Sequence, residues 1–241
     1  MVWMVIATPI AACPSRSLFG SGLCASTNAR EGFFEKAEFF AVLAEVTDAG
    51  LRDFLEWAFW TGMRKGEIAK LEWSAFDRET WMLTLPGRIT KNRRPRRLAL
   101  EGPLRAIMER RLAARRLDCR LIFWREHQGA PTQHLHPGMP VRIYEFRKTW
   151  ATACRKAGIQ AGKAGRIFHD LRRTGVRNLR RAGVDRKVAM AISGHRSESV
   201  FERYNIDTDE DLREAVEKVA SYVGQLSSPP TVVPMAVRRE G

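Results

Sequence analysis

The feature that most constrains the fold is a succession of apolar stripes with helical spacing, separated by breaks that contain glycine or proline. Phe39, Val42, Leu43 and Val46 recur at intervals of three or four residues, which is the period of an amphipathic helix. The same spacing predicts further helices at 51–61, 103–112, 144–157, 169–181, 184–193 and 211–225. A chain built this way folds mainly as packed helices.

One stretch departs from the helical period. Large apolar side chains at Trp81, Leu83 and Leu85 alternate with Met82 and Thr84, the pattern of a half-buried strand. Pro86 and Gly87 break it, and the segments 89–91 and 97–100 flank the polar run 92–95, which predicts a hairpin. The expected fold class is therefore mainly α with a small antiparallel β-sheet (α+β).

The chain is strongly basic. Its 241 residues include 41 lysines and arginines against 27 acidic residues, for a formal net charge of +14. Such an excess favours a polyanionic partner, most often nucleic acid, although a generally basic protein would show the same balance. The length is sufficient for a substantial hydrophobic core.

Cysteine usage and hydropathy argue against several other classes. The four cysteines lie far apart without a Cys-x-x-Cys pair, so we expect neither a zinc site nor a disulfide framework, and a cytoplasmic location. No apolar run reaches the roughly 20 residues that a membrane helix needs. The histidines of the 125–140 segment have no carboxylate or cysteine at ligand spacing. We therefore expect no metal and no other cofactor.

Side chains suited to chemistry concentrate between positions 169 and 204. His169 and Arg172 are three residues apart, so they share one helix face and can point at one anionic group. His195 follows Gly194, and Tyr204 comes nine residues later. A turn plus two helical turns fits that spacing and could return the phenol to the same place.

Five motifs together resemble the catalytic domain of the tyrosine recombinases, the phage integrase family of site-specific DNA recombinases. Each is weak alone, because lysine, arginine and histidine are common in a basic protein. They nevertheless fall in the family's order over residues 33–225. The motifs are Thr61-Gly62-Met63-Arg64-Lys65-Gly66-Glu67, Thr90-Lys91, His169-Asp170-Leu171-Arg172, Gly194-His195 and Tyr204.

The resemblance implies a reaction at a DNA phosphodiester without metal or ATP. Tyr204 would be the nucleophile and would form a covalent 3′-phosphotyrosyl link. Arg64 and Arg172 would bind the non-bridging oxygens, since planar guanidinium groups can replace a metal as the source of positive charge.

The remaining site residues have supporting roles in this interpretation. His195 would donate a third hydrogen bond to the phosphate, His169 would help accept the tyrosine proton, and Lys91 would protonate the leaving 5′-oxygen. Glu67, three residues after Arg64, could orient that guanidinium, or the two could form an ordinary surface pair. General contact with the DNA backbone is predicted for five more arginines, Arg93, Arg94, Arg96, Arg97 and Arg173.

The resemblance also sets expectations for organisation and partners. We expect a poorly ordered extension at 1–30 without a recognisable core-binding domain, a catalytic domain at 31–226 and a disordered tail at 227–241. The expected partners are double-stranded DNA and accessory DNA-bending or directionality proteins. The chain is expected to be a monomer when free and a homotetramer on DNA. The 211–225 helix either packs on its own domain or docks onto a neighbouring subunit.

Two other functions fit the same motifs. The chain could be a truncated relic that binds DNA without recombining it, or a nicking-closing enzyme similar to the type IB topoisomerases. The arrangement from Gly194-His195 to Tyr204 favours a recombinase over a topoisomerase.

Overall fold

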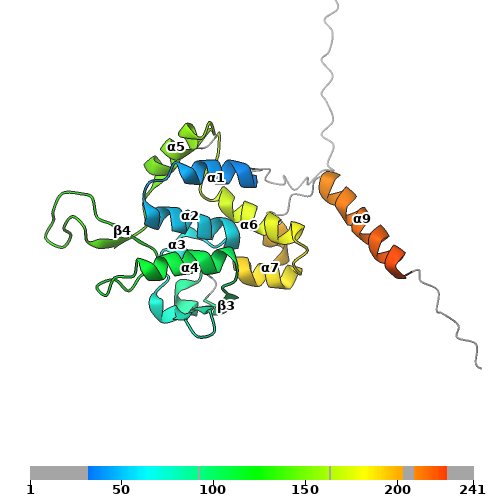
Figure 1. Ribbon diagram of the computed structural model, residues 1–241, viewed down its shortest axis with the longest axis horizontal. Helices are drawn as coiled ribbons and strands as arrows, with labels where there is room; N and C mark the ends of the chain where they lie inside the picture. Colours follow the sequence, from blue (N-terminus) through cyan, green and yellow to red (C-terminus); the bar gives the residue numbers. More distant parts are fainter. Residues whose placement is uncertain (1–31, 92, 163, 203–208, 227–241) are drawn as a thin grey trace, which may run out of the picture. The chain divides into compact units, whose positions relative to one another are not determined.

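The computed structural model describes residues 32–91, 93–162, 164–202 and 209–226. The predicted segments 1–30 and 227–241, and the proposed nucleophile Tyr204, lie outside these residues. The helices are α1 (Lys36–Ala44), α2 (Ala49–Thr61), α3 (Lys65–Ile68), α4 (Pro103–Ala113), α5 (Arg147–Lys156), α6 (Asp170–Arg181), α7 (Arg186–Ser193), α8 (Glu198–Glu202) and α9 (Asp209–Leu226) (Figure 1). The strands are β1 (Phe76–Asp77), β2 (Met82–Leu85), β3 (Arg96–Ala99), β4 (Trp124–Glu126) and β5 (Pro140–Arg142), with short 3-10 turns η1 (Trp73–Ala75) and η2 (Gly87–Ile89).

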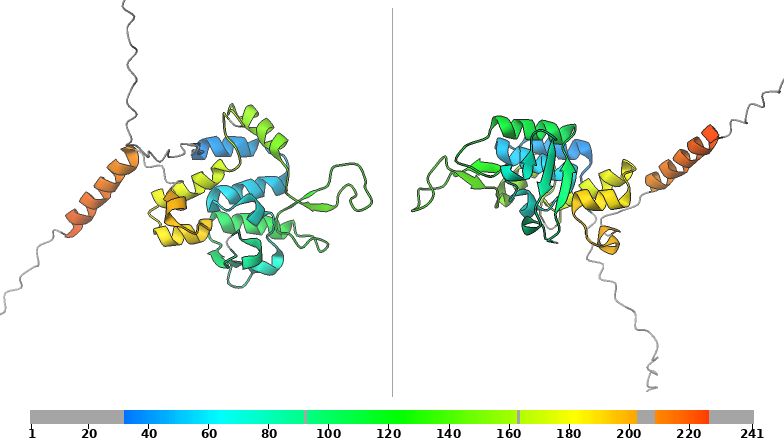
Figure 2. Two further views of the ribbon diagram at one scale, coloured as in Figure 1. Left: turned by 180° about the vertical axis from the view of Figure 1, so that it is seen from behind. Right: turned by 90° about the horizontal axis from the view of Figure 1, so that it is seen from below.

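Helix α2 is the central element of the helical core. It contacts α1, α4 and α6, and Figures 1 and 2 show α1 and α4 on opposite sides of it. Asp48 caps its start by accepting a hydrogen bond from the backbone N–H of Leu51 at 3.0 Å, as N-cap carboxylates commonly do. Gly62 ends it in the left-handed conformation at φ +61°. The helix and its stop were both predicted from the sequence, and both are confirmed.

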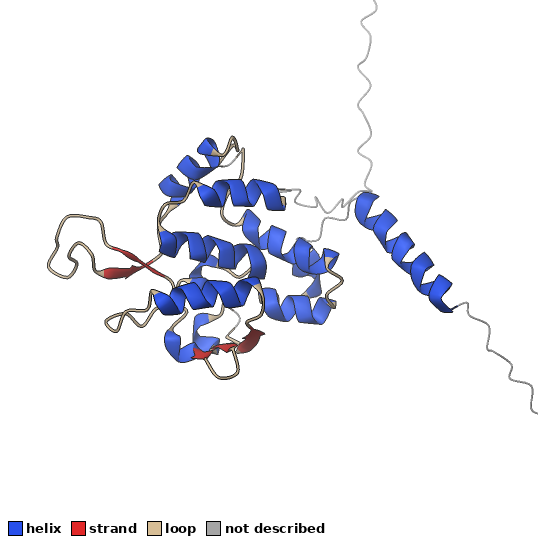
Figure 3. Ribbon diagram, in the orientation of Figure 1, coloured by secondary structure: helices blue, strands red, loops and turns tan. Residues whose placement is uncertain are grey.

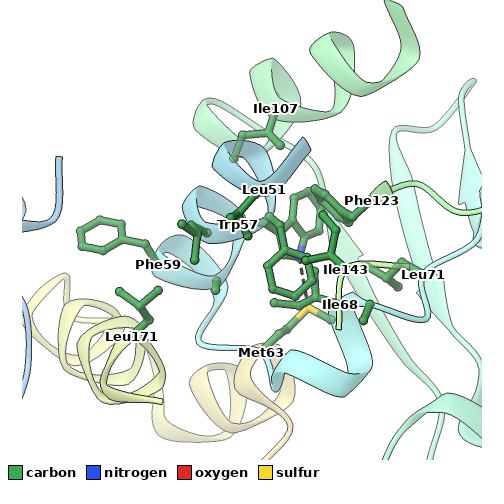
Figure 4. Close-up of a cluster of buried hydrophobic side chains, with 14 of the residues drawn as sticks. Leu51, Trp57, Phe59, Met63, Ile68, Leu71, Ile107, Phe123, Ile143 and Leu171 are labelled. Carbon is green, nitrogen blue, oxygen red and sulfur yellow. Dashed lines mark hydrogen bonds between the residues drawn. The ribbon is translucent and has the colours of Figure 1, made fainter. Parts of the chain in front are cut away.

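Large apolar side chains from several elements meet around α2 (Figure 4). Phe39 of α1 stacks on Phe59 of α2 with ring centroids 4.3 Å apart. Trp57 is fully buried, and its indole N–H donates to the sulfur of Met63 at 3.3 Å. Truncating a side chain of this kind typically costs about 3–5 kcal/mol, so this core fixes the backbone around Gly62.

Strand β2 is the middle strand of a three-stranded antiparallel sheet, in the order β1-β2-β3. Leu83 and Leu85 face the core, and Leu83 pairs with Leu98 of β3. The sequence placed residues 89–91 in the hairpin opposite β3, which is wrong. Residues Gly87–Ile89 instead form η2, and the hydroxyl of Thr90 lies at hydrogen-bond distance, 3.0 Å, from both the Gly87 and the Arg94 carbonyls.

A second, two-stranded sheet was not predicted. Strands β4 and β5 pair in antiparallel fashion, with Trp124 opposite Arg142, and Figure 3 shows them extending away from the helices. Each strand has three residues, too few to show an alternating pattern. The fold class itself, mainly α with small antiparallel sheets, is confirmed.

Helix α6 packs closely against the end of α2. A Cβ at Gly175 would lie 2.6 Å from the backbone nitrogen of Gly62, a distance that no larger residue tolerates without a backbone shift. The start of α6 is thereby held beside the turn after α2. This contact brings the 169–172 segment next to Gly62 and Arg64.

Helix α9 confirms the amphipathic helix expected near 211–225. Val216, Val219 and Tyr222 are exposed on it, at 69%, 62% and 61%. In the described part of the chain, no helix combines the length and the apolar character that crossing a bilayer requires.

Candidate catalytic site

Four of the six residues predicted to be catalytic meet where three chain segments approach one another. Arg64 lies just after the α2 turn, His169 and Arg172 lie at the start of α6, and His195 follows α7. Arg64 Nη1 donates to the Gly194 carbonyl at 3.0 Å, and Arg172 Nη1 donates to the Gly62 carbonyl at 2.6 Å. These two hydrogen bonds directly join residues that lie 130 and 110 positions apart in the sequence.

Glu67 is the centre of the first half of the site. Its side chain is 3% exposed and accepts hydrogen bonds from Arg64 Nη1 at 3.0 Å and from Arg96 Nη2 at 2.6 Å. It also lies 3.4 Å from the backbone nitrogens of Arg64 and Lys91. The sequence paired Glu67 with Arg64 alone, whereas the buried carboxylate joins α3, the η2–β3 connection and β3.

Arg96 is oriented toward this centre. Its side chain is 10% exposed, and burial lowers the pKa of the guanidinium while the charge of Glu67 opposes that shift. A Cβ at Gly194 would overlap the Arg96 guanidinium, so the glycine permits the close approach of α7 to β3. Sequence reasoning placed Arg96 among the arginines that contact the DNA backbone, because the register of β3 against Leu85 is not visible in the sequence.

Arg172 is the most enclosed cation of the site, at 2% exposure. Its Nη1 donates to the carbonyls of Gly62 and Ser193, at 2.6 and 2.5 Å. Its Nη2 lies 2.8 Å from Nε2 of His195. These contacts fix the plane of the guanidinium before any ligand arrives.

His195 is held from several sides. Gly194 adopts the left-handed conformation at φ +71° and turns the chain so that the imidazole, 7% exposed, packs edge-on against Phe201. Nδ1 lies 2.8 Å from the hydroxyl of Ser193. Burial first, and then the positive charges of Arg172 and Arg64, lower the pKa of His195 to about 3. The ring is therefore neutral at pH 7.

His169 occupies the N-cap position of α6. Part of the residue is open to solvent. Partial desolvation of the ring and the charge of Arg172 lower its pKa below the ordinary value. A neutral imidazole has a free electron pair, so His169 can accept a proton near pH 7. It borders an apolar cavity of about 480 Å³ lined also by Phe146, Trp150 and Phe168.

The remaining predicted residues differ in exposure. Lys91 is exposed, and its position is fixed through the backbone contact to Glu67. A second cavity of about 430 Å³, between the η2–β3 connection and α7, is lined by Arg96, Lys187 and His195 among others. Of the five arginines expected to contact DNA, Arg93, Arg94 and Arg97 are exposed, whereas Arg96 and Arg173 are largely buried.

The site as a whole is suited to an anion. Arg64, Arg96 and Arg172 carry three positive charges, and the carboxylate of Glu67 pairs with two of them. The two histidines are neutral at pH 7. Backbone carbonyls and Glu67 fix the arginines in advance, as electrostatic stabilisation of a phosphoryl group requires. In the described residues no three His, Cys, Asp or Glu side chains gather as metal ligands would.

Comparisons with known proteins agree with this description. The integrase of Salmonella phage P22 is 25% identical over 175 residues, which are 72% of this chain and 43% of that protein. The crystal structure of XerA recombinase superposes with a TM-score of 0.58 at 18% identity, covering 78% of this chain and 65% of that one. A lambda integrase tetramer bound to a Holliday junction gives 0.56 at 18% identity, covering 73% and 48%.

The matched region thus spans less than half of the P22 integrase. The expected fold, that of a tyrosine recombinase catalytic domain, is confirmed. Residues 34–211, most of the chain, match the phage integrase family. The protein therefore belongs to the phage integrase family.

Proposed function

We propose that the protein is a site-specific DNA recombinase that cuts and rejoins DNA strands through a covalent 3′-phosphotyrosyl intermediate on Tyr204, without metal or ATP. The observation that carries the proposal is the direct linkage of Arg64, Arg172 and His195 through the Gly62 and Gly194 turns. These three groups come from distant parts of the sequence, and all are suited to binding one phosphate.

The arginines would supply the electrostatic part of the reaction. A phosphodiester attacked by a phenolate develops negative charge on its non-bridging oxygens, and guanidinium groups stabilise that charge by bidentate hydrogen bonds. Arg172 is anchored by two carbonyls and Arg64 by Glu67 and the Gly194 carbonyl. Rigid donors of this kind need no reorganisation in the transition state.

Proton transfers would be divided between two residues. The Tyr204 hydroxyl gives its proton to neutral His169, and its oxygen forms a bond to phosphorus while the bond from phosphorus to the 5′-oxygen breaks. Lys91 gives a proton to that 5′-oxygen. Rejoining is the reverse sequence with a 5′-hydroxyl as the nucleophile, so the energy of the phosphodiester is retained in the tyrosyl link.

The partners follow from the same proposal. Double-stranded DNA would be the substrate, and the exposed arginines Arg93, Arg94 and Arg97 would contact its phosphates. We propose that four copies assemble on DNA, as in the lambda integrase tetramer bound to a Holliday junction. Accessory DNA-bending or directionality proteins and a cytoplasmic location belong to the same proposal.

A pool of nicked suicide duplexes with a randomised core tests this function whichever DNA sequence the protein recognises. Cleavage beside the nick releases a short strand, so the protein stays trapped as an adduct that survives denaturant. We expect an adduct for the wild type, with or without EDTA, and none for Tyr204→Phe. Failure of the wild type to form one would favour the DNA-binding relic, and relaxation of supercoiled plasmid without recombination would favour the topoisomerase-like alternative.

A further inference from the structure

The hydrogen bonds of His195 define which nitrogen carries its proton. Nε2 lies 2.8 Å from Arg172 Nη2. A guanidinium group only donates hydrogen bonds, so Nε2 must be the acceptor in this pair. In the DNA-free protein the imidazole therefore has no proton on Nε2.

Ser193 imposes the same state from the other side of the ring. Its hydroxyl lies 2.8 Å from Nδ1 of His195 and donates to the Ala189 carbonyl at 2.7 Å. A serine hydroxyl has one hydrogen, and the carbonyl can only accept, so that hydrogen goes to Ala189. The hydroxyl oxygen consequently accepts from Nδ1–H, and both contacts specify the neutral Nδ1–H tautomer.

This tautomer conflicts with the role assigned to His195 in the reaction. A hydrogen bond to a phosphate oxygen needs a proton on the nitrogen that faces the phosphate. A doubly protonated ring would also present a proton to the phosphate, but it would add a positive charge beside Arg172, Arg64 and Arg96. The carboxylate of Glu67 already binds two arginines and does not offset that charge. A change of tautomer leaves the charge of the site unaltered.

We propose that Ser193 is a positioning residue that switches the tautomer of His195, a role that rests on the proposed function. When a phosphate engages Arg172, Nη2 leaves Nε2, and the Ser193 hydroxyl turns from the Ala189 carbonyl to donate to Nδ1. Nδ1 releases its proton to solvent and Nε2 takes one from solvent. His195 then donates Nε2–H to the phosphate.

The hydroxyl can make this turn at little cost. Its bond to Ala189 is made to the carbonyl four residues earlier in α7, a local contact that serine forms and releases readily in helices. Ser193 is itself fully buried and His195 is 7% exposed, so in the closed site the hydroxyl, rather than water, is the partner of Nδ1. The ring exchanges its protons with solvent only when the site opens. The edge-on contact with Phe201 at 5.4 Å holds the ring while the proton changes place.

The resting tautomer is tested by nitrogen-15 NMR of histidine side chains in the DNA-free protein. Long-range proton–nitrogen couplings distinguish the Nδ1–H form from the Nε2–H form, and His195→Gln assigns the signal. We expect Nδ1–H for the wild type and for Ser193→Thr, which keeps the hydroxyl. An Nε2–H ring in the wild type would overturn the assignment, and this measurement decides it even if the protein never cleaves DNA.

The switch is tested by the rate of adduct formation on the suicide duplex. Ser193→Ala removes the hydroxyl, and we expect a fall of about 10- to 100-fold, the size of the loss when a residue that orients a metal-bound histidine is removed. The dissociation constant for DNA should change less than about twofold, and Ser193→Thr should restore most of the rate. Full activity of Ser193→Ala, or a Thr variant as slow as the Ala variant, would refute the proposal. Absence of any wild-type adduct would count against the proposed function instead.

Discussion

Replacing Glu67 with alanine removes the buried carboxylate that pairs with both Arg64 and Arg96. Arg64 can regain water because its side chain is 24% exposed, but Arg96, at 10%, would remain buried without its ion-pair partner. Breaking a buried ion pair from one side typically costs about 3–5 kcal/mol. Because Arg64 rehydrates, we expect about 3 kcal/mol, the lower end of that range.

Urea denaturation followed by tryptophan fluorescence measures this free energy of unfolding. The matched control is Glu109→Ala, which breaks the exposed pair between Arg105 and Glu109 at 3.2 Å and should cost less than about 0.5 kcal/mol. A double-mutant cycle of Glu67→Gln with Arg96→Met should give a coupling energy of about 1–3 kcal/mol. A Glu67→Ala protein as stable as Glu109→Ala would refute the view that Glu67 holds the three segments together.

Two further predictions concern the packing and the charge state of the site. Gly175→Ala places a Cβ 2.6 Å from the Gly62 nitrogen and should destabilise the fold by about 1–3 kcal/mol in the same urea denaturation assay. The control is Gly66→Ala, whose Cβ would meet nothing within 4 Å and which should not destabilise the fold. Equal effects of the two substitutions would contradict the described contact. The pKa of His195 is lowered from 6.5 to about 3, so the folded state binds fewer protons than the unfolded chain, and stability should fall as pH drops from 6.5 toward 3. His195→Gln should lose less stability than the wild type between about pH 7 and about pH 4, and parallel curves would contradict the lowered pKa.

Local chemistry explains why the helices were predictable. In α2, the apolar spacing marks the buried face and Gly62 marks the end, and both signals are present in the sequence itself. The sheet was harder to predict from the sequence, because the pairing of strands depends on partners that are distant in the chain. Residues 89–91 offered a plausible strand next to the polar run, yet β3 pairs with Met82–Leu85, whose leucines match the buried face.

The residues of the site also divide into those that the sequence could predict and those that it could not. Arg64, His169, Arg172 and His195 were predicted because the family resemblance identifies them by motif, and the structure brings them together. The position of Arg96 against Glu67 depends on the register of β3 and could not be read from spacing. Ser193 stands two residues before His195, but its meaning appears only when the Nδ1 contact and the bond to Ala189 are seen together.

The central claim is that Tyr204 becomes joined to DNA, and peptide mapping of the trapped adduct tests it most directly. The chain has three tyrosines, and trypsin releases each on a different peptide, with Tyr204 at the start of 204–213 because Arg203 precedes it. We predict that mass spectrometry will find the 3′-phosphonucleotide on Tyr204. A nucleotide on Tyr144, on Tyr222 or on a residue other than tyrosine would contradict the account.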